Sequence, residues 1–76
     1  AGLVRSLRED GGLEVAGNGF LILGAGGPAR GIASELAVLG ASRLVIANRT
    51  LSRAISLAES IQKTSNNVQI DVTTLG

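Results

Sequence analysis

The sequence lacks several residue types that proteins use for cross-linking, metal binding and acid–base chemistry. It has no cysteine, histidine, methionine, tryptophan or tyrosine, and only one phenylalanine and one proline. Without cysteine the chain forms neither a disulfide nor a thiolate metal site, which is consistent with a reducing compartment such as the cytoplasm. Without histidine it lacks the commonest general base and metal ligand. We therefore expect no metal site.

Strong net charge and long apolar runs are also missing. The net charge is only +1, which argues against nucleic-acid binding by bulk electrostatics. No apolar run approaches the roughly 20 residues that a membrane span requires, and there is no signal-peptide pattern. The chain has 76 residues and does not begin with methionine. We interpret it as one small domain or part of one, within a longer protein.

The residues that are present predict alternating strands and helices. Hydrophobic residues make up 45% of the chain, chiefly leucine, isoleucine, valine and alanine, as in buried parallel sheets covered by helices. Apolar runs predict strands over 20–23 and 43–47, and strict alternation over 68–72 predicts a strand at a sheet edge. Helical spacing predicts helices over 28–39 and 50–61, with the Thr50 hydroxyl as a cap, and a short leading helix within 1–8. Paired glycines predict a turn over 9–12.

This order of elements predicts an α/β fold with a three-stranded parallel sheet, because strands that alternate with helices form right-handed crossovers. Three strands are half of a doubly wound Rossmann domain, so residues 1–76 are predicted to be a partial dinucleotide-binding domain. In the usual strand order, the other half pairs beside the first strand. We therefore expect an unpaired apolar edge there and, as a consequence, self-association or marginal stability.

A glycine-rich turn follows the first predicted strand and opens the first predicted helix. A helix start offers unpaired N–H donors and a partial positive charge to a phosphate group. In this pattern the first glycine permits a tight turn, the second lets a pyrophosphate approach, and a third small residue lets the helix lie close to the strand. The candidate cofactor-binding residues in this turn are Gly24, Ala25, Gly26, Gly27, Pro28 and Ala29.

A second candidate site follows the strand predicted over 43–47. Dinucleotide-binding domains that use NAD carry an acidic residue here, which binds the ribose 2′-hydroxyl. This chain instead has Asn48, Arg49, Thr50 and, one helical turn later, Arg53. A carboxylate would repel a 2′-phosphate, whereas two guanidinium groups beside a neutral amide would attract it. The four residues therefore predict a preference for NADP.

Together these segments resemble the NADP-binding half of the shikimate dehydrogenases. That family has a GAGG-x-x-R glycine loop and an N-R-T-x-x-R-A segment, and both occur here, from Gly24 to Arg30 and from Asn48 to Ala54. The resemblance implies reversible, NADPH-dependent reduction of 3-dehydroshikimate to shikimate in aromatic amino-acid biosynthesis. It also implies a separate domain that binds this small-molecule substrate.

The resemblance assigns no catalytic residue to this chain. A lysine–aspartate pair on the substrate domain serves proton transfer in that family, and nothing here matches that domain. The only lysine, Lys63, lies near the end of a predicted surface helix. The isolated chain is therefore predicted to be inactive. Two alternatives remain: a non-catalytic dinucleotide-binding regulatory module, and a fragment of a glutamyl-tRNA reductase, whose N-R-T-like segment is similar.

Overall fold

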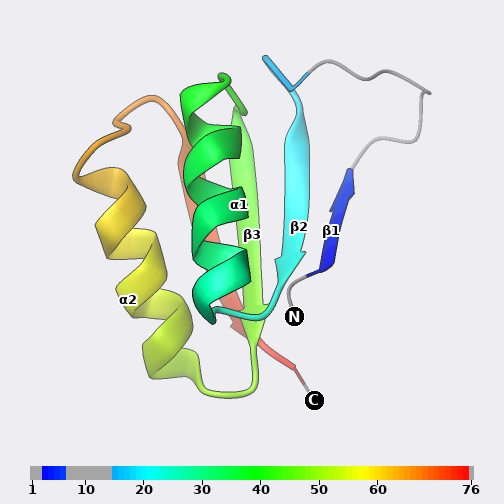
Figure 1. Cartoon of the computed structure of the whole chain (residues 1–76), viewed down its shortest axis with the longest axis vertical. Helices are drawn as coiled ribbons and strands as arrows, with labels where there is room; N and C mark the ends of the chain where they lie inside the picture. Colours follow the sequence, from blue (N-terminus) through cyan, green and yellow to red (C-terminus); the bar gives the residue numbers. More distant parts are fainter. Residues whose placement is uncertain (1–2, 7–14, 76) are drawn as a thin grey trace.

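The computed structural model describes residues 3–6 and 15–75, with side chains described from residue 15 onward. Figure 1 shows one sheet with two helices on the same face. In chain order the elements are β1 (Leu3–Ser6), β2 (Gly19–Leu23), α1 (Gly27–Val38), β3 (Arg43–Asn48), α2 (Leu51–Gln62) and β4 (Gln69–Thr74). The strands lie in the order β1-β2-β3-β4, and β2, β3 and β4 are parallel. The predicted α/β fold with a three-stranded parallel sheet is confirmed, and β4 lies at a sheet edge as expected.

The predicted leading helix is wrong. Residues Leu3–Ser6 form β1, which runs antiparallel to β2 with Leu3 opposite Leu23 and Ser6 opposite Phe20. The reason is tertiary: an isolated short helix is marginal, because nucleation fixes several residues for one hydrogen bond. Pairing with β2 instead satisfies the backbone groups of both strands. The turn predicted over 9–12 lies outside the described residues.

The prediction of an unpaired edge beside the first parallel strand is also wrong. β1 occupies the edge of β2 where the fourth strand of a doubly wound sheet would lie (Figure 1). The residues that cover this edge are those expected to form the leading helix. The expectation of self-association depended on that unpaired edge, and it loses this basis.

The core lies between the sheet and the two helices. Alternate residues of a strand point to the same face, and Ile22, Leu44 and Ile46 are fully buried under the helices. Helix α1 meets the sheet through small side chains, since Ala29 and Ala33 are buried, whereas α2 contributes larger ones. The buried positions of α2 are Ala54, Leu57 and Ile61. With the half-buried Ala58 they are the four residues whose helical spacing predicts an apolar stripe.

Gly40 ends α1, in a conformation that favours glycine. Its φ is +98°, and Leu39 is the C-cap. The Gly40 N–H donates to the Ala37 carbonyl at 3.2 Å, and the Ala41 N–H donates to the Leu36 carbonyl at 3.0 Å. These two bonds form a Schellman motif, which satisfies the last carbonyls of the helix.

We expect Gly40→Ala to destabilise the chain by about 1–3 kcal/mol, because a side chain is strained at positive φ. The added Cβ would also lie 3.4 Å from the Cα and Cβ of Ala16. Gly31→Ala is the matched control: it lies within α1, and its added Cβ would meet nothing within 4 Å. The control should be neutral or stabilising, since alanine favours helices. Urea unfolding of both variants measures the difference, and equal stabilities would contradict the assignment.

Candidate functional site

The glycine loop between β2 and α1 has the backbone geometry of an anion site. Gly24 has a φ of +106°, so the chain turns sharply directly after β2. Gly26 is the N-cap of α1 and has no side-chain cap, and Pro28 lies in the first turn. The first helical bond runs from the Arg30 N–H to the Gly26 carbonyl at 2.9 Å. Gly26 and Gly27 are exposed and occupy helix-start positions, where N–H groups have no acceptor within the helix.

The space beside Gly26 is open. Its φ of −81° and ψ of −169° suit any residue, and a Cβ built there would meet nothing within 4 Å. The fold of the described residues therefore does not itself require glycine at this position. Ala25 and Ala29, by contrast, are buried, with 6% and 1% of their surface exposed. Their small size lets α1 begin close against the sheet, as the motif predicts.

The second loop joins β3 to α2 and contains the two arginines. Asn48 is the last residue of β3, Thr50 is the N-cap of α2, and Arg53 lies in the first turn. Arg49, Thr50 and Arg53 are exposed. The predicted cap position is confirmed, but the Thr50 hydroxyl makes no cap hydrogen bond. Instead, the Asn48 side-chain Nδ2 donates to the Thr50 carbonyl at 2.9 Å, a contact that the sequence analysis missed.

The two loops are joined by the main chain. The Gly24 N–H donates to the Ala47 carbonyl at 2.7 Å, directly before Asn48. The Leu75 N–H, just after β4, donates to the Asn48 carbonyl at 3.1 Å. The fold therefore brings the two segments of candidate residues, 24–29 and 48–53, to the same end of the sheet, where the parallel strands finish. No side-chain pattern signals these backbone bonds, because they depend on the register of β2 against β3.

The carboxyl end of the parallel strands is positively charged. Arg49 and Arg53 lie here, and Arg30 lies in the first turns of α1. Neither helix has an acidic residue in its first turn. Within residues 15–75 the one ion pair joins the Arg43 Nη2 to the Asp71 Oδ2 at 3.0 Å, where β3 and β4 begin. Because both helix starts add partial positive charge, this end of the sheet suits a ligand with several phosphates.

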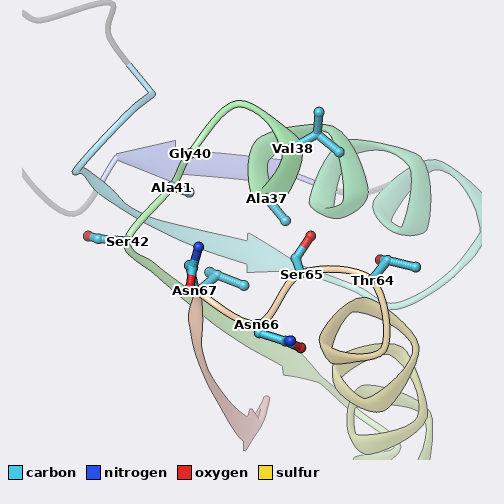
Figure 2. Close-up of a pocket in the computed structure, with 10 residues that line it drawn as sticks. Ala37, Val38, Gly40, Ala41, Ser42, Thr64, Ser65, Asn66 and Asn67 are labelled. Atoms are coloured by element: carbon cyan, nitrogen blue, oxygen red, sulfur yellow. The ribbon is translucent and has the colours of Figure 1, made fainter.

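A hollow of about 650 Å³ lies at the opposite end of the sheet, where β3 and β4 begin. Figure 2 shows it between the end of α1 and the loop from α2 to β4, with Ser65, Asn66 and Asn67 among the lining residues. It contains none of the predicted site residues and no charged side chain. Within the described residues no three acidic, histidine or cysteine residues come together as a metal site. No helix in this part of the chain is long and apolar enough to span a membrane.

Comparison with known proteins gives the family. The family model described as shikimate/quinate 5-dehydrogenase matches residues 7–75 of the 76. The chain belongs to this family. The match includes the glycine loop and the arginine loop, so the resemblance drawn from these two segments is confirmed.

Curated members of the family are similar over most of this chain. A shikimate dehydrogenase (NADP(+)) from Methanopyrus kandleri is 47% identical over 62 residues, which cover 82% of this chain and 21% of that protein. The enzyme of the same name from Alkaliphilus oremlandii is 43% identical over 74 residues, 97% of this chain and 26% of that protein. The Methylococcus capsulatus enzyme is 54% identical over 56 residues, 74% of this chain and 20% of its own length. The chain thus spans about a fifth to a quarter of these dehydrogenases.

A solved structure has the same fold. The ligand-free 5-ketofructose reductase of Gluconobacter sp. strain CHM43 is 36% identical, with a TM-score of 0.74. The match covers 83% of this chain and 22% of the reductase. This reductase is named for 5-ketofructose, whereas the curated dehydrogenases are named for shikimate. This part of the fold is therefore found in proteins with different named substrates.

Proposed function

We propose that this chain is the NADP(H)-binding portion of an oxidoreductase that reduces 3-dehydroshikimate to shikimate in aromatic amino-acid biosynthesis. The observation that carries the proposal is the joining of the two loops by the 2.7 Å bond between the Gly24 N–H and the Ala47 carbonyl. This bond supports the proposal because it joins the glycine loop, at a helix start, to the strand that leads into two exposed arginines. NADP carries phosphate in two places, the pyrophosphate and the 2′-phosphate, so each loop would bind one of them.

The proposed roles divide between the loops. The N–H groups of the exposed Gly26 and Gly27 bind the pyrophosphate, and the open space beside Gly26 admits it. The buried Ala29 lets α1 begin close to the sheet, so that the helix start lies beside the pyrophosphate. The planar fork of Arg49 suits two oxygens of the 2′-phosphate, and Arg53 adds a second positive charge one turn later. Ala25 and Pro28 shape the loop, and Thr50 contributes a hydroxyl to the phosphate site. When it is bound, the cofactor supplies the hydride.

The substrate half of the proposal is supported by the names of the curated relatives, which are shikimate dehydrogenases (NADP(+)). The proposed substrate domain, with its own acid–base groups, belongs to the rest of such a protein. The family match also favours this proposal over the glutamyl-tRNA reductase alternative. With the biosynthetic role we propose a cytoplasmic location, which cell fractionation of the native source would test.

We expect the purified chain to show no dehydrogenase activity. A bound cofactor needs a positioned acid or base and an oriented substrate before hydride transfer is fast. In the resembled family the acid–base pair belongs to the substrate domain, and this chain has no histidine to replace it. The measurement is the absorbance of reduced nicotinamide after the chain is mixed with shikimate and NADP. A no-protein sample is the control, and turnover above that control would contradict the prediction.

The same chain tests cofactor binding without turnover. Isothermal calorimetry with NADP and with NAD should show tighter binding of NADP and weakening of that binding as salt is added, because the arginines are exposed to solvent. Equal binding of the two cofactors would contradict the proposed selectivity. No binding of either would contradict the dinucleotide role itself.

A further inference from the structure

The hollow at the amino end of the parallel strands is a second candidate site, apart from the proposed cofactor site. It lies between the end of α1, the segment that leads into β3 and the loop from α2 to β4 (Figure 2). Its volume of about 650 Å³ falls within the range of roughly 300–1,000 Å³ that is typical of small-molecule sites. The hollow is therefore large enough to hold a small organic molecule.

The floor of the hollow is apolar. Ala41 and Val68 are buried, with 3% and 4% of their surface exposed, and Ala37 is half-buried. Ala41 and Val68 belong to the hydrophobic core, so the same packing that holds the helices on the sheet also holds this floor. The floor offers an uncharged surface on which the C–H groups of a ligand ring would pack.

Polar side chains of the loop from α2 to β4 point into the hollow. Figure 2 shows the Ser65 hydroxyl directed toward α1 at Ala37, and the Asn67 amide directed toward the segment at Ala41. A hydroxyl and an amide each donate and accept hydrogen bonds. Ser65 and Asn67 therefore offer both kinds of bond to a ligand that lies on the floor.

The other two hydroxyls of the lining already have acceptors in the main chain. The Ser42 Oγ donates to the Gly17 carbonyl at 3.1 Å, and the Thr64 Oγ1 donates to the Ile61 carbonyl at 3.2 Å. These bonds fix the walls of the hollow. They leave ligand recognition to the loop residues that point inward.

The hollow is uncharged, in contrast to the arginine-bearing end of the sheet. No charged residue lines it, and Lys63, the C-cap of α2, lies outside the lining. Both helices end here, α1 at Val38 and α2 at Gln62, and neither has a basic residue in its last turn. Helix C-termini carry a partial negative charge, which disfavours an anion nearby. This end of the sheet therefore does not suit a phosphate or a carboxylate.

We propose that the hollow binds a small uncharged molecule with several hydroxyl groups, a monosaccharide or a polyol of that size. The C–H face of such a molecule packs on Ala41 and Val68, while its hydroxyls bond to Ser65 and Asn67. A purely apolar ligand would take these two polar groups out of water without replacing their hydrogen bonds, which costs free energy. The site goes beyond the proposed function, because its occupancy does not require NADP.

The test is a titration of the isotope-labelled full-length protein that carries this chain, followed by NMR at the backbone amides of Gly40, Ser65 and Asn67. Glucose is the probe, and tetrahydropyran-2-methanol, which has the same ring but a single hydroxyl, is the matched control ligand. Glucose should shift these amides. The control ligand should bind about five- to a hundredfold more weakly, which corresponds to the loss of two hydrogen bonds. Glucuronate, which carries a carboxylate, should bind about two- to fivefold more weakly than glucose.

Two variants test the polar contacts separately. Ser65→Ala and Asn67→Leu each remove one polar group and should weaken glucose binding by about two- to tenfold, the range for one lost hydrogen bond. Ser52→Ala makes the same change as Ser65→Ala at an exposed position in the first turn of α2, at the other end of the helix, and should leave glucose binding unchanged. Thermal unfolding shows whether each variant folds, and either loop variant alone is sufficient for the test.

Several outcomes would overturn the proposal. No shift of the three amides at the solubility limit of glucose would mean that the hollow holds only water. Equal binding of glucose and the control ligand would mean that the hydroxyls are not recognised, and tighter binding of glucuronate would mean that the site is not one for uncharged molecules. Unchanged affinity in both loop variants would place the sugar elsewhere. Failure of the proposed function looks different, because it appears in the titrations with NADP and NAD.

Discussion

Replacing Arg49 with alanine is expected to lower the preference for NADP over NAD by about ten- to a hundredfold. A hydrogen bond to a charged group contributes roughly 1.5–3 kcal/mol, and in the proposed site Arg49 makes such bonds to the 2′-phosphate. NAD lacks this phosphate, so its use should change little. The measurement is the ratio of kcat/KM for NADP to that for NAD in the full-length protein, before and after Arg49→Ala.

Arg43→Ala is the matched control for this experiment. It removes the same charge and side chain, but Arg43 lies at the start of β3 and is paired with Asp71. An exposed ion pair of this kind contributes at most about 1 kcal/mol to stability. The control variant should therefore keep its NADP preference. If Arg49→Ala leaves the ratio unchanged, or if Arg43→Ala lowers it equally, Arg49 is only one surface charge among others.

Replacing Leu44 with alanine is expected to destabilise the chain by about 2–5 kcal/mol, because a large buried side chain is lost and a cavity remains. Leu44 is fully buried in β3, the strand that lies between β2 and β4. Domains have about 0.05–0.15 kcal/mol of stability per residue, which is on the order of 4–11 kcal/mol for a chain of 76 residues. The variant should be partly or wholly unfolded in modest urea.

Leu39→Ala makes the same chemical change at the surface. Leu39 is 52% exposed at the end of α1, so its loss removes little buried area. Surface substitutions of this kind usually change stability by less than about 0.5 kcal/mol. Urea unfolding of both variants, followed by circular dichroism, measures the contrast. Equal midpoints would mean that the core does not lie between the sheet and the two helices.

The sequence predicted the parallel strands and both main helices to within two residues. These elements have strong local signals, such as the apolar run over 20–23, the glycine after α1 and the buried stripe of α2. β1 could not be predicted in the same way, because four residues carry little periodic information. Its state is decided by the neighbouring edge of β2, which is a tertiary effect.

The candidate site was predicted by residue type but not by its internal contacts. Gly24 follows one parallel strand and Asn48 ends the next, and the carboxyl ends of parallel strands meet at the same end of a sheet. The motif did not predict that the Thr50 hydroxyl is unused or that the Asn48 amide is bonded to the Thr50 carbonyl. Such contacts depend on a few ångströms of loop geometry, which residue spacing does not determine.

The bond between the Gly24 N–H and the Ala47 carbonyl has a consequence for how cofactor choice evolves. It joins two backbone groups, so a substitution that preserves the register of β2 and β3 does not remove it. The side chains of Arg49 and Arg53, in contrast, are exposed, so each can change while the backbone that carries it keeps its place beside the sheet. With the proposed function, cofactor preference can therefore change through exposed side chains, without a step that disturbs the pairing of β2 and β3.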